Sequence, residues 1–331
     1  MKRIFYLFSA GKLLRRANTL ELINKANEKK RIPIEIVDAI YVFSDITVNS
    51  RLLQFVSRKE IPLYFFNKKS NYFGVFYPKE QNVSGTVLVK QVTHHLDHSK
   101  RLTLAKAFVS GAIANMVKVL SYYNRRGRDL TDRLNSLKKI DGELENLENI
   151  EEIMGCEGKA WNTYYAGWQH IITDKNFEFE ERSRRPPRNP TNALISFGYS
   201  LLYTTVLSEI YKTQLNPTVS FLHAASTRRF SLALDLAEIF KPIIVDRLIF
   251  NLLNHSQITQ NDFEKGLNYC YLKESGRKTF VAKFEEKLAT TVFHPRLKRN
   301  VSYRQLIRLE CFKLIKHLLG EEYYTPLKVW W

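Results

Sequence analysis

The spacing of apolar residues changes between residues 80 and 97, and this change restricts the possible folds more than any other feature of the chain. Before it, short runs rich in Ile, Val, Phe and Tyr are bounded by turn signals, a pattern typical of β-strands. After it, residues such as Leu102, Val109 and Leu120 belong to a series that recurs mostly at spacings of three and four, the period of an α-helix. The sequence therefore predicts an α+β fold, with a small N-terminal β-domain followed by a larger all-α domain.

The boundaries follow from the same pattern. Residues 1–80 form the predicted β-domain, with one short helix at Ser50–Lys59, and the mostly polar stretch 81–96 is the predicted linker. Residues 97–331 form the helical domain, in which Asn189 caps a helix that has Pro190 at its first position. That helix is apolar almost all round, which predicts a buried central helix. The remaining apolar runs predict these strands and helices: Ile4–Phe8, Ile32–Ile36, Ala39–Phe43, Ile61–Phe66, Tyr72–Tyr77, Ser231–Phe240, Pro242–Asn254, Phe280–Thr290 and Tyr303–Leu319.

The charge of the chain points to a polyanionic partner. It carries 51 Lys and Arg against 33 Asp and Glu, a net charge of +18. Nucleic acid is the first class of partner to expect, and an anionic membrane surface is the second. No uninterrupted apolar run reaches the roughly 18 to 20 residues of a spanning helix, so no membrane partner is expected.

The cysteines favour a reducing compartment. Cys156, Cys270 and Cys311 are far apart and odd in number, so they predict neither a thiolate metal site nor a disulfide framework. The N-terminal apolar stretch is too short for a secretory signal. A cytoplasmic location is the simplest interpretation.

Glu157 is the first candidate for chemistry. It follows Met154 by three positions and precedes Trp161 by four, which places a carboxylate within the apolar stripe of its helix. Burying an unpartnered carboxylate is costly, so the residue is either a structural acid paired with an Arg or a metal ligand or catalytic acid.

His223 and a pair of acids are the other candidates. His223 lies among apolar and small residues, where a histidine with purely structural bonds is the alternative to a ligand. Asp235 and Glu238 are three positions apart on one apolar helix and face the same way. A divalent metal would relieve their repulsion; alternatively, one faces solvent and the other pairs with Arg228 or Arg247.

Two carboxylates and one imidazole suit Mg²⁺ or Mn²⁺ better than a structural zinc site. Such a metal with open positions is what phosphoryl transfer to or from a nucleic acid requires. The basic loop that contains Arg182, Arg184, Arg185 and Arg188, together with the pair Arg228 and Arg229, is either a DNA-contacting surface or a solvated charge run. His94, His95 and His98 lie close together, but a metal site there is a weak hypothesis.

Two segments have recognisable motifs: Glu157-Gly158-Lys159-Ala160 with Tyr164 has the form EGxA…Y, and Arg185–Leu194 is similar to RPPxDPxNALL. In this order, the two motifs resemble those of the CRISPR spacer-acquisition integrase family. Leu222-His223 with Ser231–Leu248 resembles its second catalytic block. Further similarity covers Ile61–Asn67 and Tyr72–Pro78 in the N-terminal part and Tyr303–Pro326 near the C-terminus.

The resemblance implies an enzyme of CRISPR adaptation that inserts short DNA fragments into a CRISPR array. The 3′-hydroxyl of the fragment attacks a phosphodiester at the repeat, with Glu157, His223 and Glu238 as ligands of Mg²⁺ or Mn²⁺. It also implies a homodimer formed largely through the β-domain, a small ferredoxin-like adaptation nuclease as partner, and double-stranded DNA as substrate. The family often has Asp where this chain has Glu238. Asp235 is therefore an alternative third ligand, although motif position favours Glu238 and assigns Asp235 a supporting or packing role.

Two other functions use the same residues. A general metal-dependent nuclease acting on branched or single-stranded DNA would replace the 3′-hydroxyl with water. A non-catalytic nucleic-acid-binding scaffold would use the basic surface alone and need no metal at Glu157.

Overall fold

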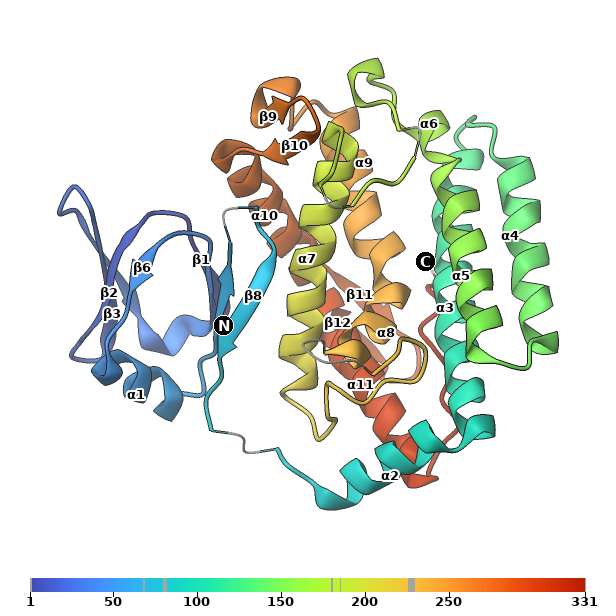
Figure 1. Ribbon diagram of the computed structural model, residues 1–331, viewed down its shortest axis with the longest axis horizontal. Coiled ribbons are helices and arrows are strands. Elements are labelled where there is room, and N and C mark those ends of the chain that lie inside the picture. The colour runs from blue at the N-terminus through green and yellow to red at the C-terminus, as the bar shows by residue number, and fades with distance from the viewer. Residues whose placement is uncertain are drawn as a thin grey trace. The chain divides into compact units, whose positions relative to one another are not determined.

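The computed structural model describes residues 2–67, 69–79, 82–179, 181–184, 186–225 and 230–330 (Figure 1). The chain divides into two compact units, Met1–Gln81 and Asn82–Trp331.

The N-terminal unit consists of two four-stranded sheets and one helix. In the first sheet, β1, β5 and β7 run parallel to one another and β8 pairs antiparallel with β7; the order of the second is β4-β3-β2-β6. Helix α1 begins at Ser50 because the Asn49 side chain accepts a bond from the Leu52 N–H at 2.9 Å. The strands and helix are β1 (Arg3–Leu7), β2 (Gly11–Arg16), β3 (Thr19–Asn24), β4 (Lys29–Pro33), β5 (Val37–Val42), β6 (Ile46–Thr47), α1 (Ser50–Arg58), β7 (Leu63–Phe66) and β8 (Tyr72–Phe76).

Most of the stretch predicted as a linker, residues 81–96, is helical. Helix α2 (Gly85–Leu96) belongs to the second unit and contacts α3 and α11. Its Gln91 is fully buried and its amide bonds the backbone of Asn216 and Val219 at 2.7 to 2.9 Å. The prediction failed because the stretch is mostly polar, and the buried Gln91, which adds to the buried Val87, is a polar anchor that the apolar pattern does not reveal.

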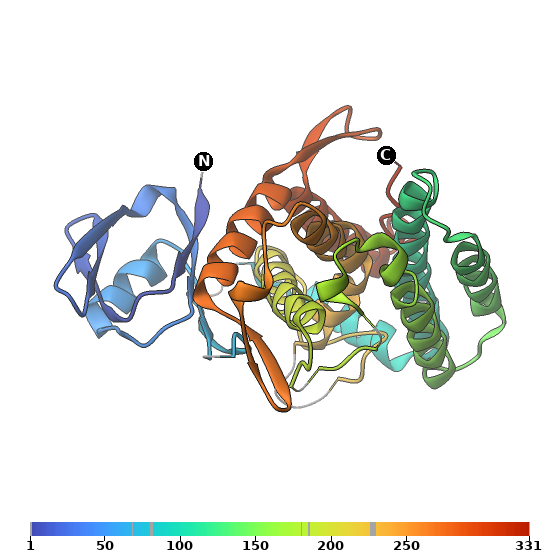
Figure 2. The ribbon, with the colours of Figure 1, turned by 90° about the horizontal axis from the view of Figure 1, so that it is seen from above.

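The second unit is built around α7 (Pro190–Ile210), which is buried on nearly all sides, as predicted. Asn189 accepts a 2.8 Å bond from the Asn192 N–H and starts the helix. Helices α3, α4 and α5 pack against one another, and α8 contacts both α3 and α7 (Figures 1 and 2). The other helices are α3 (His98–Asn124), α4 (Thr131–Glu143), α5 (Ile150–Tyr165), α6 (Trp168–Ile171), α8 (Ser231–Phe240), α9 (Arg247–Asn254), α10 (Glu274–Ala289) and α11 (Tyr303–Leu319).

A wide π-helical turn, η4 (Lys241–Asp246), joins α8 to α9. It approaches α7 closely at Gly198, where an added Cβ would lie only 2.5 Å from a side-chain carbon of Val245. The glycine therefore lets η4 pack directly onto the central helix. Such turns are rare and recur at functional sites.

Two antiparallel hairpins interrupt the helices, so the second unit is mainly rather than entirely α-helical. They are β9 (Phe263–Gly266) with β10 (Tyr269–Leu272), and β11 (Thr291–His294) with β12 (Arg299–Ser302). In Figure 2 the hairpin β11/β12 extends away from the helices. Each strand has only four residues, too few for a period of two to be distinguished in the sequence.

Helices α3 and α7 are long and apolar enough to cross a membrane by length and composition, although no unbroken apolar run had suggested such a segment. Within the part of the second unit that the structure describes, 78% of the apolar window of α7 and 56% of that of α3 are buried. This burial is the pattern of core helices.

Candidate active site

Glu157, His223 and Glu238 come from three different segments of the second unit. Glu157 lies in the middle of α5, Glu238 lies on α8, and His223 lies in the loop that precedes α8. Helices α5 and α8 both pack against α3, which brings the two acids to the same region (Figure 1). Glu238 is buried, whereas Glu157 and His223 are half-buried.

The two glutamates interact directly. Burial, together with the charge of Glu238 and a hydrogen bond to it, raises the pKa of Glu157 to about 7 against the opposing charges of Lys241 and His223. The indole N–H of Trp161, one turn along α5, donates to Glu238 Oε2 at 3.0 Å. At neutral pH, therefore, Glu157 keeps a proton for part of the time while Glu238 carries the charge.

The cation that balances Glu238 is Lys241. Its ammonium donates to Glu238 Oε1, three residues back along the chain. Burial by itself would raise the pKa of Glu238, but Lys241, His223 and the Trp161 bond outweigh it and lower that pKa. Of the two arginines considered as partners, Arg247 is not the one that pairs, and Arg228 lies outside the described residues.

The Asp235 carboxylate fixes the loop that contains His223 through hydrogen bonds to its backbone. Its Oδ2 accepts backbone bonds from Phe221 at 2.7 Å and Leu222 at 3.0 Å, and its Oδ1 accepts from the His223 N–H at 2.9 Å. The imidazole Nδ1 also bonds Oδ1, at 2.9 Å. Burial disfavours the charged imidazole, but the Asp235 bond prevails and the pKa of His223 is raised.

This arrangement bears on the third ligand. Both oxygens of Asp235 are occupied by the loop that they hold, whereas the Nε2 of His223 is left on the side away from Asp235. An imidazole held by a carboxylate through one nitrogen presents the other to a metal. Both oxygens of Glu238 are bonded too, but to the side chains of Lys241 and Trp161, so the structure assigns Asp235 the role of orienting the imidazole and the choice of third ligand still rests on motif position.

The donor set fits a hard divalent cation, since it combines two carboxylates with one imidazole. Among the residues that the structure describes, no three His, Cys, Asp or Glu side chains are gathered closely enough to form a ready ligand cluster. The positive charge that the two acids need comes instead from Lys241 and from the proton on Glu157. A divalent cation at Glu157, His223 and Glu238 would replace both.

A buried tyrosine network lies beside the site, and the sequence analysis missed it. The Tyr199 hydroxyl donates to Asp246 Oδ1 at 3.0 Å and bonds the Tyr165 hydroxyl at 3.0 Å. The Lys241 ammonium lies 4.9 Å from the ring centre of Tyr199. The turn η4 thus contacts Tyr199 at both ends, through Lys241 and Asp246. The sequence signal that could have pointed to this network is the pair Lys241 and Asp246, which flank the apolar run 242–245.

Asp246 is fully buried and has no cationic partner among the described residues, and burial raises its pKa well above the usual range. Its Oδ2 has no hydrogen-bond partner there, and neither has the buried Tyr164 hydroxyl, whose approach to Asp246 falls outside bonding geometry. Burial therefore favours the protonated form of the carboxyl group at the centre of this network.

The basic residues predicted to contact DNA differ in their surroundings. The guanidinium of Arg182 donates to Asn192 at 2.8 Å and to Ser196 at 3.1 Å, so this side chain fastens the loop to α7 rather than facing solvent. Arg184 and Arg188 are exposed. Arg185, Arg228 and Arg229 lie outside the described residues.

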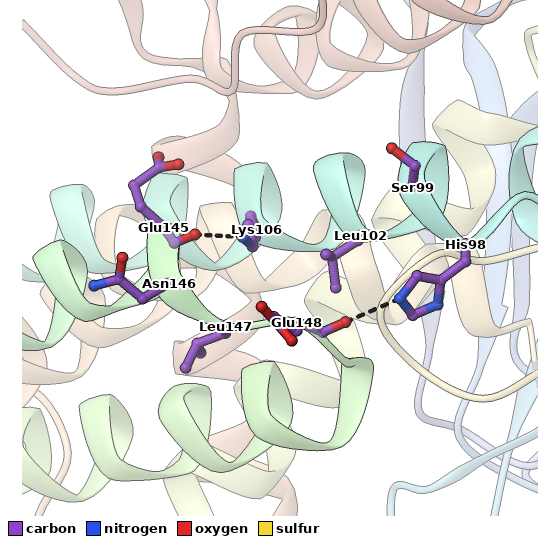
Figure 3. Close-up of a pocket in the computed structure, with 8 residues that line it drawn as sticks. All are labelled: His98, Ser99, Leu102, Lys106, Glu145, Asn146, Leu147 and Glu148. Carbon is purple, nitrogen blue, oxygen red and sulfur yellow. Dashed lines mark hydrogen bonds between the residues drawn. The ribbon is translucent and has the colours of Figure 1, made fainter.

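A separate pocket of about 800 Å³ lies between the first half of α3 and the segment before α5, lined by His98, Ser99, Leu102, Lys106, Glu145, Asn146, Leu147 and Glu148 (Figure 3). None of the candidate residues lines it. His98 bonds the Glu148 carbonyl oxygen at 2.9 Å, while His94 and His95 bond backbone oxygens of Lys90 and Ser220. The three histidines thus make backbone contacts and do not converge.

Known proteins resemble this chain over its length. A family model described as CRISPR associated protein Cas1 matches residues 5–286. The CRISPR-associated endonuclease Cas1 of Fusobacterium nucleatum is 49% identical over 331 residues, which cover 100% of this chain and 98% of that protein. The structure of a Cas1 protein from Thermotoga maritima has a TM-score of 0.88 at 42% identity, covering 97% of this chain and 99% of its own.

More distant structures share the fold alone. A casposase bound to an integration product has a TM-score of 0.87 at 20% identity, covering 99% of this chain and 93% of the casposase. A chain of a Cas6-RT-Cas1–Cas2 complex has a TM-score of 0.84 at 19% identity, covering 98% of this chain and 36% of the other. With the family model matching most of the sequence and the relatives aligned end to end, the chain belongs to the Cas1 family of CRISPR-associated endonucleases.

Proposed function

We propose that this protein is a Mg²⁺- or Mn²⁺-dependent endonuclease and integrase that inserts short double-stranded DNA fragments into a CRISPR array. The observation that carries the proposal is the pair of acids Glu157 and Glu238, whose shared positive charge is the Lys241 ammonium. Beside them lies the imidazole of His223, which bonds Asp235 through Nδ1 and not through Nε2. Glu157, His223 and Glu238 would hold the metal. When bound, it would polarise a phosphate oxygen and position the attacking hydroxyl.

The other residues prepare the site. Asp235 orients His223 through Nδ1 and fixes its loop through three backbone bonds. Trp161 fixes the rotamer of Glu238 from α5. Lys241 keeps Glu238 ionised within a buried environment, so the carboxylate is available as a ligand without first losing a proton.

The reaction exchanges one phosphodiester for another. The 3′-oxygen of the fragment bonds to a phosphorus at the repeat and its proton passes to solvent, while the bond from that phosphorus to the repeat's own 3′-oxygen breaks and the released oxygen takes up a proton from solvent. Because one such bond forms as another breaks, the step needs no outside energy source. A protein of the same fold is described bound to an integration product, which supports strand transfer as the reaction.

The partners of the proposal are DNA, a second copy and a small ferredoxin-like adaptation nuclease. The net charge of +18 supports DNA as substrate. A Cas6-RT-Cas1–Cas2 complex includes a chain of this fold, which supports an assembly with such a nuclease. The N-terminal unit, with its two sheets, is the proposed dimerisation unit.

The test compares joining with hydrolysis on one substrate. A short duplex with free 3′-hydroxyls is incubated with a repeat-containing plasmid in Mg²⁺, Mn²⁺ or EDTA, beside the same duplex with 3′-deoxy ends. We expect joined product only with the free hydroxyls and a divalent metal. Cleavage without joining would instead indicate a general nuclease.

Glu157→Ala and His223→Ala should abolish joining and leave DNA binding largely intact. Glu151→Ala, which changes an exposed acid on the same helix, is the matched control and should join at the wild-type rate. Joining by Glu157→Ala at the wild-type rate would refute the site, and unchanged activity in EDTA would refute the metal.

A further inference from the structure

Asn115, in the middle of α3, is a fully buried amide that joins α8 to the C-terminal end of the chain. Its Nδ2 donates to the carbonyl oxygens of Ile239 and Leu327, each at 2.9 Å. Its Oδ1 accepts the Val329 N–H at 3.0 Å. Both donor hydrogens and the acceptor oxygen are thus used by backbone groups of other segments, which leaves the amide one orientation.

The bond to Ile239 falls beside a candidate ligand. Ile239 directly follows Glu238 in the last turn of α8, where α8 passes into the wide turn η4. The last carbonyl oxygens of an α-helix lack partners within it, and Pro242 has no N–H to offer the preceding turn. The Asn115 amide therefore adds, from α3, a donor at a place where α8 is short of them.

Glu238 is consequently held from two helices. Trp161 of α5 bonds the side chain through the indole N–H at 3.0 Å, and Asn115 of α3 bonds the backbone at the next residue. Loss of the second bond would let the last turn of α8 shift along α3, because a buried carbonyl oxygen would then need another donor. Such a shift would carry the Glu238 carboxylate with it.

Residues 324–329, called the C-terminal segment below, are fixed to α11 as well as to α3. The Tyr324 hydroxyl and the Leu327 N–H both donate to Oε1 of the buried Glu310, at 2.6 and 3.1 Å. Two of the three bonds of Asn115 go to this segment. The segment thus decides how the amide is turned toward Ile239.

Gly111 shows how closely these parts fit. It lies one turn before Asn115 on the same face of α3. An added Cβ would lie 2.7 Å from the Pro326 Cβ and 3.5 Å from the Ile239 Cγ1. The C-terminal segment and α8 therefore meet α3 at one place, and a single methyl group there would displace the segment.

We propose that Asn115 is a positioning residue for the reaction at Glu157 and Glu238, and that the C-terminal segment holds its amide in the required orientation. The inference rests on the proposed function for the identity of the reaction. Asn115 is buried and acts through the Ile239 carbonyl group rather than by touching DNA.

The first variant is Asn115→Leu, which removes all three bonds and roughly keeps the volume. We expect single-turnover joining to slow by about 100-fold, the effect of a displacement of about 1 Å at a reacting group, with unchanged duplex DNA affinity. In metal-free protein with isotope-labelled tryptophan, the indole N–H resonance of Trp161 should also move, because its acceptor Glu238 moves. Trp161→Phe assigns that resonance.

Gln91→Leu is the matched control. Gln91 is also a fully buried amide, with two donor bonds and one acceptor bond to backbone groups of Asn216 and Val219. Its loss should lower the melting temperature about as much as Asn115→Leu does and leave the Trp161 resonance in place. Equal movement of the resonance in both variants would mean general loosening and overturn the inference.

Gly111→Ala tests the C-terminal segment without changing Asn115. Alanine favours the helix, so the variant should fold even if Asn115→Leu does not. It should move the Trp161 resonance in the same direction and slow joining less. Gly142→Ala, in α4 with open space around the added methyl, should behave as the wild type.

Each remaining outcome decides one part. A Trp161 resonance that stays in place in Asn115→Leu, or joining at the wild-type rate despite its movement, would overturn the role of Asn115. If that variant does not fold, an unmoved resonance in Gly111→Ala overturns the inference. A wild-type protein that joins no DNA would refute the proposed function, while the resonance would still report whether Asn115 places Glu238.

Discussion

His223 and Asp235 are joined by a 2.9 Å hydrogen bond between Nδ1 and Oδ1, and the same Oδ1 accepts the backbone N–H of His223 at 2.9 Å. One carboxylate therefore sets both the backbone position and the ring orientation of the histidine. Since Asp235 is fully buried and His223 is half-buried, the imidazole can present only its Nε2 side to a substrate. The carboxylate is thus a positioning group.

Replacing Asp235 with Asn should reduce strand transfer by about 10- to 100-fold, the usual effect of losing a carboxylate behind a ligand histidine. In the wild type, four hydrogen bonds reach the two carboxylate oxygens of Asp235. The Asn side chain has only one acceptor oxygen, so the loop at Phe221–His223 should loosen. The pKa of His223 should also fall, which imidazole proton NMR shifts against pH would detect. Asp132→Asn, an exposed change at the start of α4, should alter none of these.

Glu157 should make the metal-free protein less stable as the pH rises. Its pKa of about 7 in the fold lies above the ordinary value of 4.5, so the folded state binds the proton more tightly. The stabilisation is complete below about pH 4.5 and is lost as the pH rises through 7. Melting temperatures in EDTA between pH 5 and 8 should fall more steeply for the wild type than for Glu157→Gln. Equal slopes would contradict the raised pKa.

Lys241→Met should destabilise the metal-free protein by about 3 to 5 kcal/mol, because it leaves the buried Glu238 without its cation. Mn²⁺ should restore more of the melting temperature in this variant than in the wild type. The matched control is Lys212→Met. Its partner Glu209 is also buried but keeps Arg308 at 2.7 Å, so the loss should be smaller and insensitive to Mn²⁺.

Asp246→Asn should be tolerated at neutral pH, since the amide resembles the protonated acid that the buried site favours. The raised pKa means that wild-type stability is lost as the pH rises from about 4 toward that pKa, so the variant should melt higher than the wild type in alkaline buffer. Chemical denaturation at pH 7 and pH 9 measures the difference. Tyr199→Phe, which removes the donor to Asp246 but keeps the ring beside Lys241, should destabilise the protein at pH 7 and keep Lys241 in place. A variant Asp246→Asn that is less stable than the wild type at both pH values would show that the acid is ionised.

Local sequence was sufficient wherever one residue type dictates one geometry. Asn189 followed by Pro190 predicted the start of α7, and the apolar composition of that helix predicted its burial. The β-rich runs predicted the N-terminal unit, although β2, which carries exposed Lys12, Arg15 and Arg16, and β3, which carries the buried Glu21, were not distinguished as strands. Motif order selected Glu157, His223 and Glu238; the structure couples Glu157 electrostatically to Glu238 and His223, and their role as metal ligands stays a prediction.

What the tertiary structure alone decided is which group pairs with which. Lys241 rather than Arg247 balances Glu238, Asp235 holds the His223 loop, Arg182 is bonded inward, and α2 is packed where a linker was expected. Each outcome depends on contacts between segments far apart in the chain. Sequence periodicity reports which face of an element is apolar, but a hydrogen bond or ion pair depends on distances of a few ångströms that only the packed helices determine.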